Sequence, residues 1–169
     1  MNKYKILKDQ YIEAIGKKLY RIQALKDFNG VKAGDTGGYI ENESNLSQYG
    51  NAWVYDDARV CGNARVSDNA QVSDNAWVSG NTRVYGNAQV SSTRHYLNLG
   101  PIGSRNGYTT IYRDKNRKAM VICGCFSGNL DDFERAVHKT HAGTKYEAEY
   151  MALIQLARMR EKEWLNEVD

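Results

Sequence analysis

The pattern of apolar and polar positions repeats every six residues between Gly50 and Ser91. Valine occupies the fifth position of seven successive hexads, and a small residue stands two positions before each valine. Residues two apart on a strand point to the same side, so both should face inward while the residue between them faces outward. The Gly-Asn or Asp-Asn pair between hexads is turn chemistry. Each hexad therefore predicts a very short strand followed by a corner. The inner pairs are Ala52 and Val54, Ala58 and Val60, Ala64 and Val66, Ala70 and Val72, Ala76 and Val78, Thr82 and Val84, and Ala88 and Val90.

Three such hexads close one triangular coil, so residues 18 apart should stack at the strand spacing of ~4.8 Å. Upstream, Ile40 and Leu46 keep the six-residue spacing, and the two extra residues Gln48-Tyr49 predict a small outward bulge. The whole repeat then forms about three coils, which is near the minimum for a stacked solenoid, and both ends need caps. The outward residues fall in three columns: Trp53 with Gln71 and Gln89, Arg59 with Trp77, and Arg65 with Arg83.

The flanking segments have the patterns of ordinary strands and helices. Strands are predicted over residues 3–7 and 17–25, and again over 95–99, 108–114 and 118–126. A first helix is predicted over 130–141 with Asn129 as N-cap, and a second begins with the capping box Thr144 to Glu147. The fold class is mainly β with a small α+β cap. We divide it into an N-terminal β cap (1–36), a repeat region (37–91) and a C-terminal α+β domain (92–169).

Composition and charge narrow the compartment and the kind of partner. The three cysteines (Cys61, Cys123 and Cys125) are an odd number, which does not favour a disulfide framework. No apolar run approaches a membrane span, and the chain has no signal-peptide core, so a cytoplasmic protein without membrane contact is expected. Residues 94–118 contain six basic residues and one acidic residue, which favours an anionic partner. The low net charge of +3 and the lack of a nucleic-acid-binding motif argue against polymeric nucleic acid.

The candidate ligand site lies in this basic stretch, RHYLNLGPIGSRNGYTTIYRD. Glycines bring the backbone close to a ligand, hydroxyls and exposed N–H groups donate, guanidiniums suit phosphate, and aromatic rings stack on a base. The alternative is a long surface loop, and the spacing is not that of a P-loop. The predicted ligand-binding residues are Arg94, His95, Gly103, Ser104, Arg105, Tyr108, Thr109, Thr110 and Arg113.

Two other kinds of chemistry were weighed against this site. Cys123 and Cys125 should share one side of a strand, and His138 and His141 one face of a helix, which together would make a tetrahedral zinc site. However, C-x-C is not a standard zinc spacing, and strand cysteines are usually buried as small hydrophobes. Nucleophilic catalysis by cysteine and histidine lacks an evident third, orienting group. We therefore predict no metal, no cofactor and no catalytic residue.

The hexads resemble the left-handed parallel β-helix of hexapeptide-repeat proteins, and the hand is taken from that resemblance. The segment LYRIQALKDFNGVKAGDTGGYIENESNLSQYGNAWVYDDARV, together with GPIGSRNGYTTIYRD and CGCFSGNLDDFERAVHKTH, is similar to phage and prophage proteins of the YdcK-like transferase type. The resemblance implies a phage or prophage origin and a homotrimer built along the solenoid faces. Arginine and aromatic residues suit such an interface, although packing of the tryptophans against the caps of the same chain would also account for them. The predicted interface residues are Trp53, Arg59, Trp77 and Arg83.

The resemblance implies little about activity. Hexapeptide acyltransferases resemble one another in a histidine base near the coils, whereas here no histidine precedes His95 and no outward hexad residue is a carboxylate. The leading hypothesis is a non-enzymatic protein that sequesters a small phosphorylated, nucleotide-like ligand, as a sponge for a host anti-phage signal. The alternatives are an acyl-CoA-dependent acyltransferase that uses His95, and a scaffold that binds a protein through its tryptophan and arginine columns.

Overall fold

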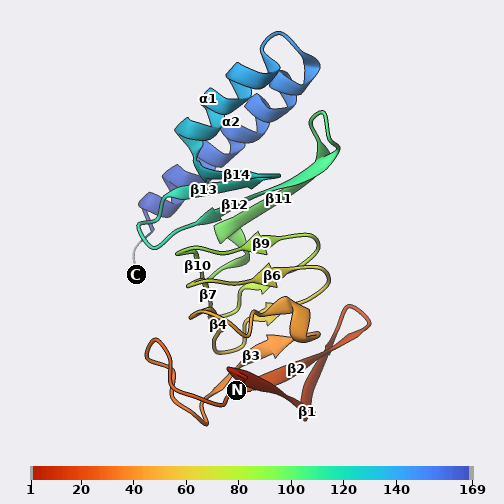
Figure 1. The fold of residues 1–169 in the computed structure, drawn as a ribbon, viewed down its shortest axis with the longest axis vertical. Coiled ribbons are helices and arrows are strands. Elements are labelled where there is room, and N and C mark those ends of the chain that lie inside the picture. Colours follow the sequence, from red (N-terminus) through yellow and green to blue (C-terminus); the bar gives the residue numbers. More distant parts are fainter. Residues whose placement is uncertain (1, 168–169) are drawn as a thin grey trace. The chain divides into compact units, whose positions relative to one another are not determined.

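The computed structural model describes residues 2–167, which divide into two compact units after Thr93. Figure 1 shows the repeat and its N-terminal strands in the first unit, and a sheet with two helices in the second. The division falls two residues after the end of the predicted repeat region. No helix within residues 2–167 is long and apolar enough to cross a membrane. Each unit is described in turn.

The first unit begins with a hairpin whose sheet continues into the repeat. Strands β1 (Tyr4–Ala14) and β2 (Lys17–Ala24) pair antiparallel, and β3 (Thr36–Ile40) adds to β2. Strand β3 then pairs in parallel with β5 (Arg59–Val60), and β5 with β8 (Trp77–Val78). The N-terminal cap and one face of the solenoid are therefore a single five-stranded sheet.

The other rungs of the solenoid form two further parallel stacks. Strand β7 (Gln71–Val72) lies between β4 (Trp53–Val54) and β10 (Gln89–Val90), and β6 (Arg65–Val66) pairs with β9 (Arg83–Val84). Leu46 extends the last stack through a parallel bridge to Val66. The seven valines are at most 1% exposed and the small residues before them are fully buried, so the interior is filled by two positions of each hexad.

The corners explain why each hexad begins with glycine or aspartate. All seven first residues adopt a positive φ, a backbone conformation that glycine tolerates freely and aspartate better than most side chains. Asparagine follows six of the seven, and five of these asparagines form amide ladders, with Nδ2 to Oδ1 distances of 2.9 Å between Asn51 and Asn69 and 3.1 Å between Asn63 and Asn81. The polar half of the repeat thus satisfies both the turn geometry and its own hydrogen bonds. The corner residues are Gly50, Asp56, Gly62, Asp68, Asp74, Gly80 and Gly86.

The two-residue insertion Gln48-Tyr49 joins the first coil to the N-terminus. The Tyr49 side chain is 86% exposed, whereas the Gln48 Oε1 accepts hydrogen bonds from the N–H groups of Lys3 at 2.9 Å and Tyr4 at 3.2 Å. The Gln48 Nε2 in turn donates to the Tyr4 carbonyl. One residue of the insertion therefore points to solvent and the other fixes the start of β1.

Trp53 is not at the outward interface that the repeat predicts. Its side chain is 1% exposed, with the rings of Tyr4 and Phe28 at centroid distances of 6.1 and 5.4 Å. The Lys3 ammonium lies beside them and donates to the carbonyl of Ala52 at 2.7 Å. Trp53 does leave the solenoid interior, as the alternation requires, but the N-terminal segment of the same chain covers it. The prediction of an oligomer contact is wrong for this residue.

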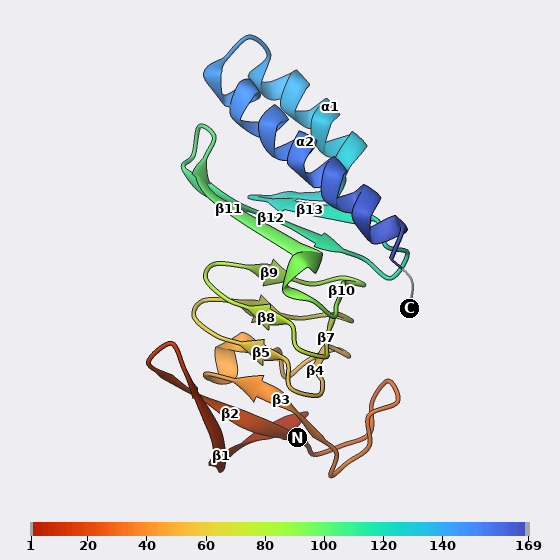
Figure 2. The same cartoon turned by 180° about the vertical axis from the view of Figure 1, so that it is seen from behind.

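The second unit is an antiparallel sheet with two helices packed on it (Figure 2). Its strands pair in sequence order: β11 (Tyr96–Ile102), β12 (Gly107–Arg113), β13 (Ala119–Cys123) and β14 (Phe126–Asn129). A short 3-10 turn, η2 (Thr93–His95), precedes them, and another, η1 (Glu43–Asn45), lies before the bulge of the first unit. The segment predicted as one strand over 118–126 is instead a tight hairpin, with Gly124 at φ +60° in its turn. Cys123 and Cys125 therefore do not share one side of a strand.

The helices begin at the predicted caps. Helix α1 (Leu130–His141) has Asn129 as N-cap, whose side chain accepts from the N–H of Asp132. Helix α2 (Lys145–Leu165) begins after Thr144, whose hydroxyl accepts from the N–H of Glu147. The Glu147 carboxylate accepts from the N–H of Gly143. Apolar residues from both helices and the sheet form one core, in which Trp164 is fully buried.

Candidate functional site

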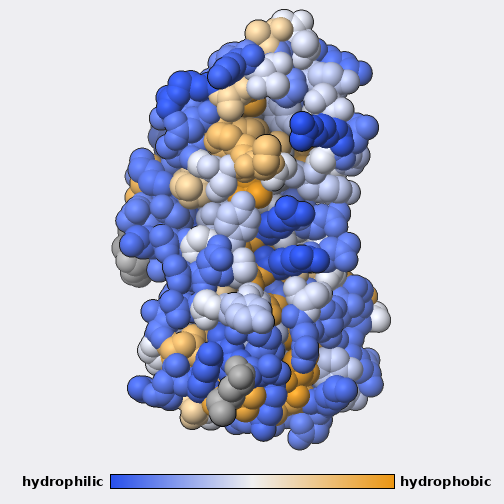
Figure 3. Space-filling model, in the orientation of Figure 1, coloured by the Kyte–Doolittle hydropathy of each residue, from blue (hydrophilic) through white to orange (hydrophobic). Residues whose placement is uncertain are grey.

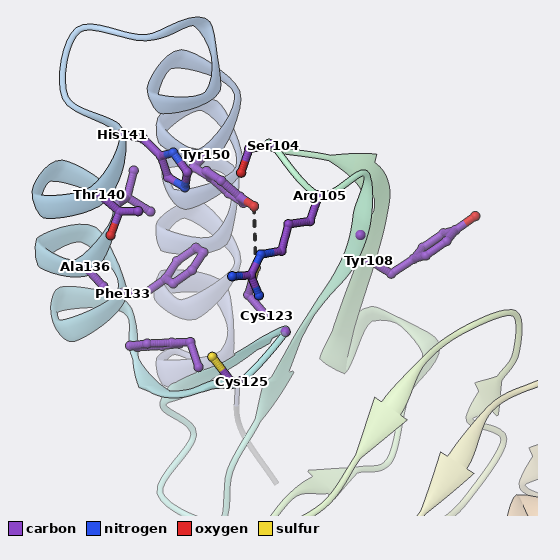
Figure 4. Close-up of a pocket in the computed structure, with 14 residues that line it drawn as sticks. Ser104, Arg105, Tyr108, Cys123, Cys125, Phe133, Ala136, Thr140, His141 and Tyr150 are labelled. Atoms are coloured by element: carbon purple, nitrogen blue, oxygen red, sulfur yellow. Dashed lines mark hydrogen bonds between the residues drawn. The ribbon is translucent and has the colours of Figure 1, made fainter.

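A cavity of about 370 Å³ opens in the C-terminal unit (Figure 4). Its lining comes from four places: the turn between β11 and β12, the turn between β13 and β14, helix α1, and one tyrosine of helix α2. On the face shown in Figure 3, apolar surface gathers over this unit beside hydrophilic side chains. A concave site with apolar walls and a few polar groups is the usual form of a small-molecule site.

Aromatic side chains form the wall on the helical side of the cavity. The rings of Phe126 and Phe133 lie 5.1 Å apart, and Phe133 meets Tyr150 edge to face at 5.6 Å. His141 stacks on Tyr150 at 5.5 Å with an interplanar angle of 29°. Such contacts fix the rings in place, so the wall is preformed in the absence of a ligand.

Gly103 has no side chain, and this leaves room for the Tyr150 hydroxyl beside it. Gly103 has φ +70°, and a Cβ atom there would lie 2.0 Å from the Tyr150 hydroxyl. Its N–H donates to the Glu149 carboxylate at 2.8 Å. The sequence predicted that the backbone around Gly103 and Ser104 would donate to a ligand anion. For the Gly103 N–H that prediction is wrong, because a carboxylate of the same unit already accepts from it. Gly103 shapes the site by admitting Tyr150.

The polar end of the cavity holds a short chain of hydrogen bonds. The Thr109 hydroxyl donates to the Cys123 sulfur at 3.2 Å, and the Cys123 thiol donates to the Tyr150 hydroxyl oxygen at 3.7 Å. Burial, with the Cys123 hydrogen bond, raises the pKa of Tyr150 to about 12. Tyr150 therefore keeps its proton at neutral pH and remains able to donate a hydrogen bond to a ligand.

Arg105 brings the positive charge to the site. It follows the turn residue Gly103, and Figure 4 shows its guanidinium pointing toward the Tyr150 hydroxyl and Cys123. Among the cavity residues in the described part of the chain, Arg105 carries the only guanidinium. The apolar walls beside it reduce competition from water, which strengthens a charge-assisted hydrogen bond to an anion.

The structure brings three of the nine predicted ligand residues to this cavity, namely Ser104, Arg105 and Tyr108. Of these, Tyr108 is 45% exposed, and its ring points away from α1 in Figure 4. Thr109 and Thr110 are buried within the sheet. The Thr109 hydroxyl meets Cys123, and that of Thr110 donates to Asn98 at 3.1 Å. Strand alternation directs the two hydroxyls to opposite faces of the sheet, and each is bonded there to a residue of a neighbouring strand.

The remaining predicted residues are held at the end of helix α2. His95 is 4% exposed, with its Nε2 3.0 Å from a carboxylate oxygen of Glu167, and the Arg113 guanidinium lies 2.7 Å from the same oxygen. Arg94 pairs with Glu163 at 2.9 Å. These three residues hold the C-terminal end of α2 against the sheet. Of the predicted basic residues, Arg105 is therefore the one that lines the cavity, and the other three have a structural role.

Sequence reasoning missed most of the residues that line the cavity. Cys123, Cys125 and His141 were considered as zinc ligands, and Phe133 and Tyr150 were not among the predicted ligand-binding residues. The fourth candidate ligand, His138, is directed to Glu147 at 2.6 Å. Within residues 2–167, no group of three or more histidine, cysteine or acidic side chains is placed to hold a metal ion. A turn signal at Gly124 was the clue that the two cysteines belong to a hairpin.

Two comparisons place the repeat among known proteins. Residues 58–74 and 70–86 match the family described as YdcK Beta solenoid repeat. The chain is also similar to the uncharacterized acetyltransferase YdcK of Escherichia coli (strain K12), with 44% identity over 62 residues. That match covers 32% of this chain and 19% of the relative, so the chain corresponds to about a fifth of the relative's length. These findings support a YdcK-like β-solenoid repeat protein.

Proposed function

We propose that the C-terminal unit captures a small molecule that carries a flat ring and one anionic group, as a phosphorylated nucleotide does. The observation that supports this best is the cavity itself, which combines aromatic walls with the single guanidinium of Arg105. Its volume of about 370 Å³ lies within the usual range for small-ligand sites and sets an upper limit on the buried part of the ligand.

The two ends of the cavity suit different parts of such a molecule. Phe126 and Phe133 offer ring surfaces for stacking, which is tolerant of the identity of the base. Arg105 offers a planar fork of donors for a phosphate, and the protonated Tyr150 adds one hydroxyl. A ligand that satisfies both ends must be amphipathic, with the ring buried and the anion near the rim.

Capture without turnover would make the protein a sponge for its ligand. The phage or prophage origin expected from the sequence is the ground for proposing that the ligand is a signal of host defence. In this proposal the outer faces of the solenoid hold the copies of the expected trimer together. Sedimentation analysis of the full chain tests that assembly separately from ligand binding.

The first test is native mass spectrometry of the purified protein, before and after denaturation. A phosphorylated small molecule released on unfolding would support capture and identify the ligand. Protein that takes up nothing from a mixture of nucleoside monophosphates and cyclic dinucleotides would contradict it. A protein partner recovered in place of a small molecule would favour the scaffold alternative.

The second test assigns the ligand to this cavity. Cys125 is exposed at its rim, so a bound ligand should slow its alkylation by iodoacetamide. Arg105→Gln should weaken binding about tenfold or more, the scale of a lost charge-assisted hydrogen bond. Arg135→Gln is the matched control, because Arg135 lies on helix α1 and pairs with Asp132 outside the cavity lining. Equal affinities for the two variants would remove Arg105 from the site.

Acetyl transfer is the second candidate, and the partial identity to an uncharacterized acetyltransferase is the observation that favours it. His95, the base expected from the sequence, is buried against Glu167. His141 is the histidine that lines the cavity. Incubation with acetyl-CoA and a panel of amine and hydroxyl acceptors tests this candidate. Turnover that is lost in His141→Gln and kept in His138→Gln would replace capture by catalysis.

A further inference from the structure

A second polar recess lies on the solenoid, in the first unit of the chain. It measures about 230 Å³ and is lined by Ser44, Asn63, Arg65, Asn81 and Arg83. Among these described lining residues there are two guanidiniums and three neutral hydrogen-bonding side chains, and no carboxylate. The recess therefore has a net positive charge built from side chains that are all able to donate hydrogen bonds.

The repeat aligns the two arginines. Arg65 and Arg83 are direct partners in the parallel pairing of β6 with β9, and both side chains are exposed. Neighbouring strands lie about 4.8 Å apart, so two like charges are held side by side. Like charges directly opposite each other on a sheet are destabilising. A bound anion would offset that repulsion, which means that binding and stability should rise together.

The residues beside the arginines are already ordered. The Asn63 Nδ2 donates to the Asn81 Oδ1 at 3.1 Å, which orients both amides along the column. Ser44 lies in the short turn η1, and its N–H donates to the side chain of Asn42, the residue that caps the turn. The neighbouring stack treats its outward arginine differently, because Arg59 lies over the ring of Trp77, with its guanidinium carbon 5.5 Å from the ring centroid. Only in the β6 and β9 stack does the described repeat place arginine beside arginine.

We propose that the Arg65 and Arg83 column binds a phosphate or diphosphate group of a small molecule. Guanidiniums pair with phosphate through two parallel hydrogen bonds, and two stacked guanidiniums present two such forks to one doubly charged group. A monocarboxylate carries one charge and offers its two oxygens to one fork only. The site is separate from the cavity of the C-terminal unit and does not depend on the function proposed for it.

Calorimetric titration of the full chain with inorganic pyrophosphate, at constant ionic strength, tests the proposal. The wild-type protein should bind pyrophosphate saturably, and Arg65→Gln/Arg83→Gln should bind it at least tenfold more weakly, the scale expected when charge-assisted hydrogen bonds are lost. Arg59→Gln is the matched control on another face of the solenoid. This control should keep the wild-type affinity. Arg105→Gln shows in addition whether any of the bound pyrophosphate lies in the C-terminal cavity.

Separate titrations with phosphate and citrate distinguish the chemistry of the anion. Phosphate binding weaker than pyrophosphate binding, with citrate the weakest, would support two forks on one phosphorylated group. Citrate as the tightest of the three, no saturable binding of pyrophosphate, or an equal loss in Arg59→Gln would overturn the proposal. A loss in Arg105→Gln alone would assign the anion to the other unit and overturn it as well.

Thermal unfolding gives an independent reading that does not depend on heats of binding. Pyrophosphate should raise the Tm of the wild-type protein and of Arg59→Gln, and leave that of the double variant unchanged. Arg65→Lys/Arg83→Lys keeps the charge and removes the forks, so it should show a smaller rise than the wild type. An equal rise in the lysine variant would show that charge alone attracts the anion, and it would overturn the phosphate specificity.

Discussion

The two units of this chain fill their interiors in opposite ways. The solenoid uses one small and one branched side chain per hexad, all nearly inaccessible, in an order that repeats without variation in size except at Thr82. The C-terminal unit packs leucine, phenylalanine, tyrosine and tryptophan from two helices and a sheet, and it keeps a cavity of about 370 Å³ beside that core. Identical rungs match one another closely, whereas dissimilar elements meet with gaps. The irregular unit therefore keeps a cavity of small-molecule size beside its core.

The largest effect is expected where the irregular core depends on one residue. Trp164 is fully buried, and its Nε1 donates to the carbonyl of Arg94 at 3.0 Å. Trp164→Ala should destabilise the C-terminal unit by about 3–5 kcal/mol, the usual cost of truncating a buried aromatic residue. Urea unfolding followed by helical circular dichroism reports on this unit, because both α-helices lie in it. A loss below about 1 kcal/mol would mean that the core tolerates gaps better than its packing indicates.

The next largest effect is expected at Gly103, where the backbone of the β11–β12 turn contacts Tyr150. Gly103→Ala places a methyl group against Tyr150 at a positive φ, and should cost about 2–4 kcal/mol through overpacking and backbone strain. Gly107→Ala is the matched control, since a Cβ atom there meets nothing within 4 Å. The same urea experiment compares them. Equal effects would indicate a general sensitivity of the β11–β12 hairpin.

One substitution made in both units contrasts their interiors directly. Ala70→Leu in the solenoid should cost about 1–3 kcal/mol or more, because Ala70 is fully buried between rungs. Ala136→Leu adds the same atoms to a residue that lines the cavity, so stability should change by less than about 1 kcal/mol. Ligand binding in the C-terminal unit should be blocked by Ala136→Leu alone. A destabilised Ala136→Leu variant with normal ligand binding would show that Ala136 lies in a closely packed core and not beside a ligand cavity.

The smallest expected effect concerns the charged residue inside the N-terminal cap. Burial lowers the pKa of Lys3 from 10.5 to about 8. Between these values the unfolded chain holds more protons than the folded one, so the Lys3 contribution to stability rises with pH. The rise from pH 7.5 to 9.5 should be on the order of 1 kcal/mol, and it should be absent in Lys3→Met. The measurements stop at pH 9.5 because of Tyr4, whose pKa is raised by burial. Tyr4 ionises near pH 10 in the unfolded chain, so above that pH its contribution to the free energy of unfolding falls.

Urea unfolding of the wild type and Lys3→Met at both pH values gives this difference, and groups common to both proteins cancel. Identical pH profiles would show that the Lys3 ammonium is well solvated in the folded protein. That outcome would also weaken the view that the cap seals Trp53 from water.

The sequence predicted the first unit better than the second, for a physical reason. A strict period states which way each side chain points, and the burial of residues such as Val72 and Ala70 follows from it. It does not state what lies outside, which is why the sequence left open whether Trp53 packs against a sister subunit or against a cap of its own chain. The cavity arises because Tyr150 approaches Gly103 from a distant part of the chain. No local pattern records that approach, and of the cavity residues only Ser104, Arg105 and Tyr108 were predicted.

The 18-residue period of the coils also has a genetic consequence. Asn51, Asn69 and Asn87 stack at intervals of 18 residues, so one coil is a complete unit of sequence. A duplication of the coding segment for one coil would insert without a seam and lengthen the Arg65 and Arg83 column. A duplication of a single hexad would instead move every later residue to the next face and separate the arginines. Within residues 50–91, duplication of whole coils is therefore the change of length that preserves all three columns.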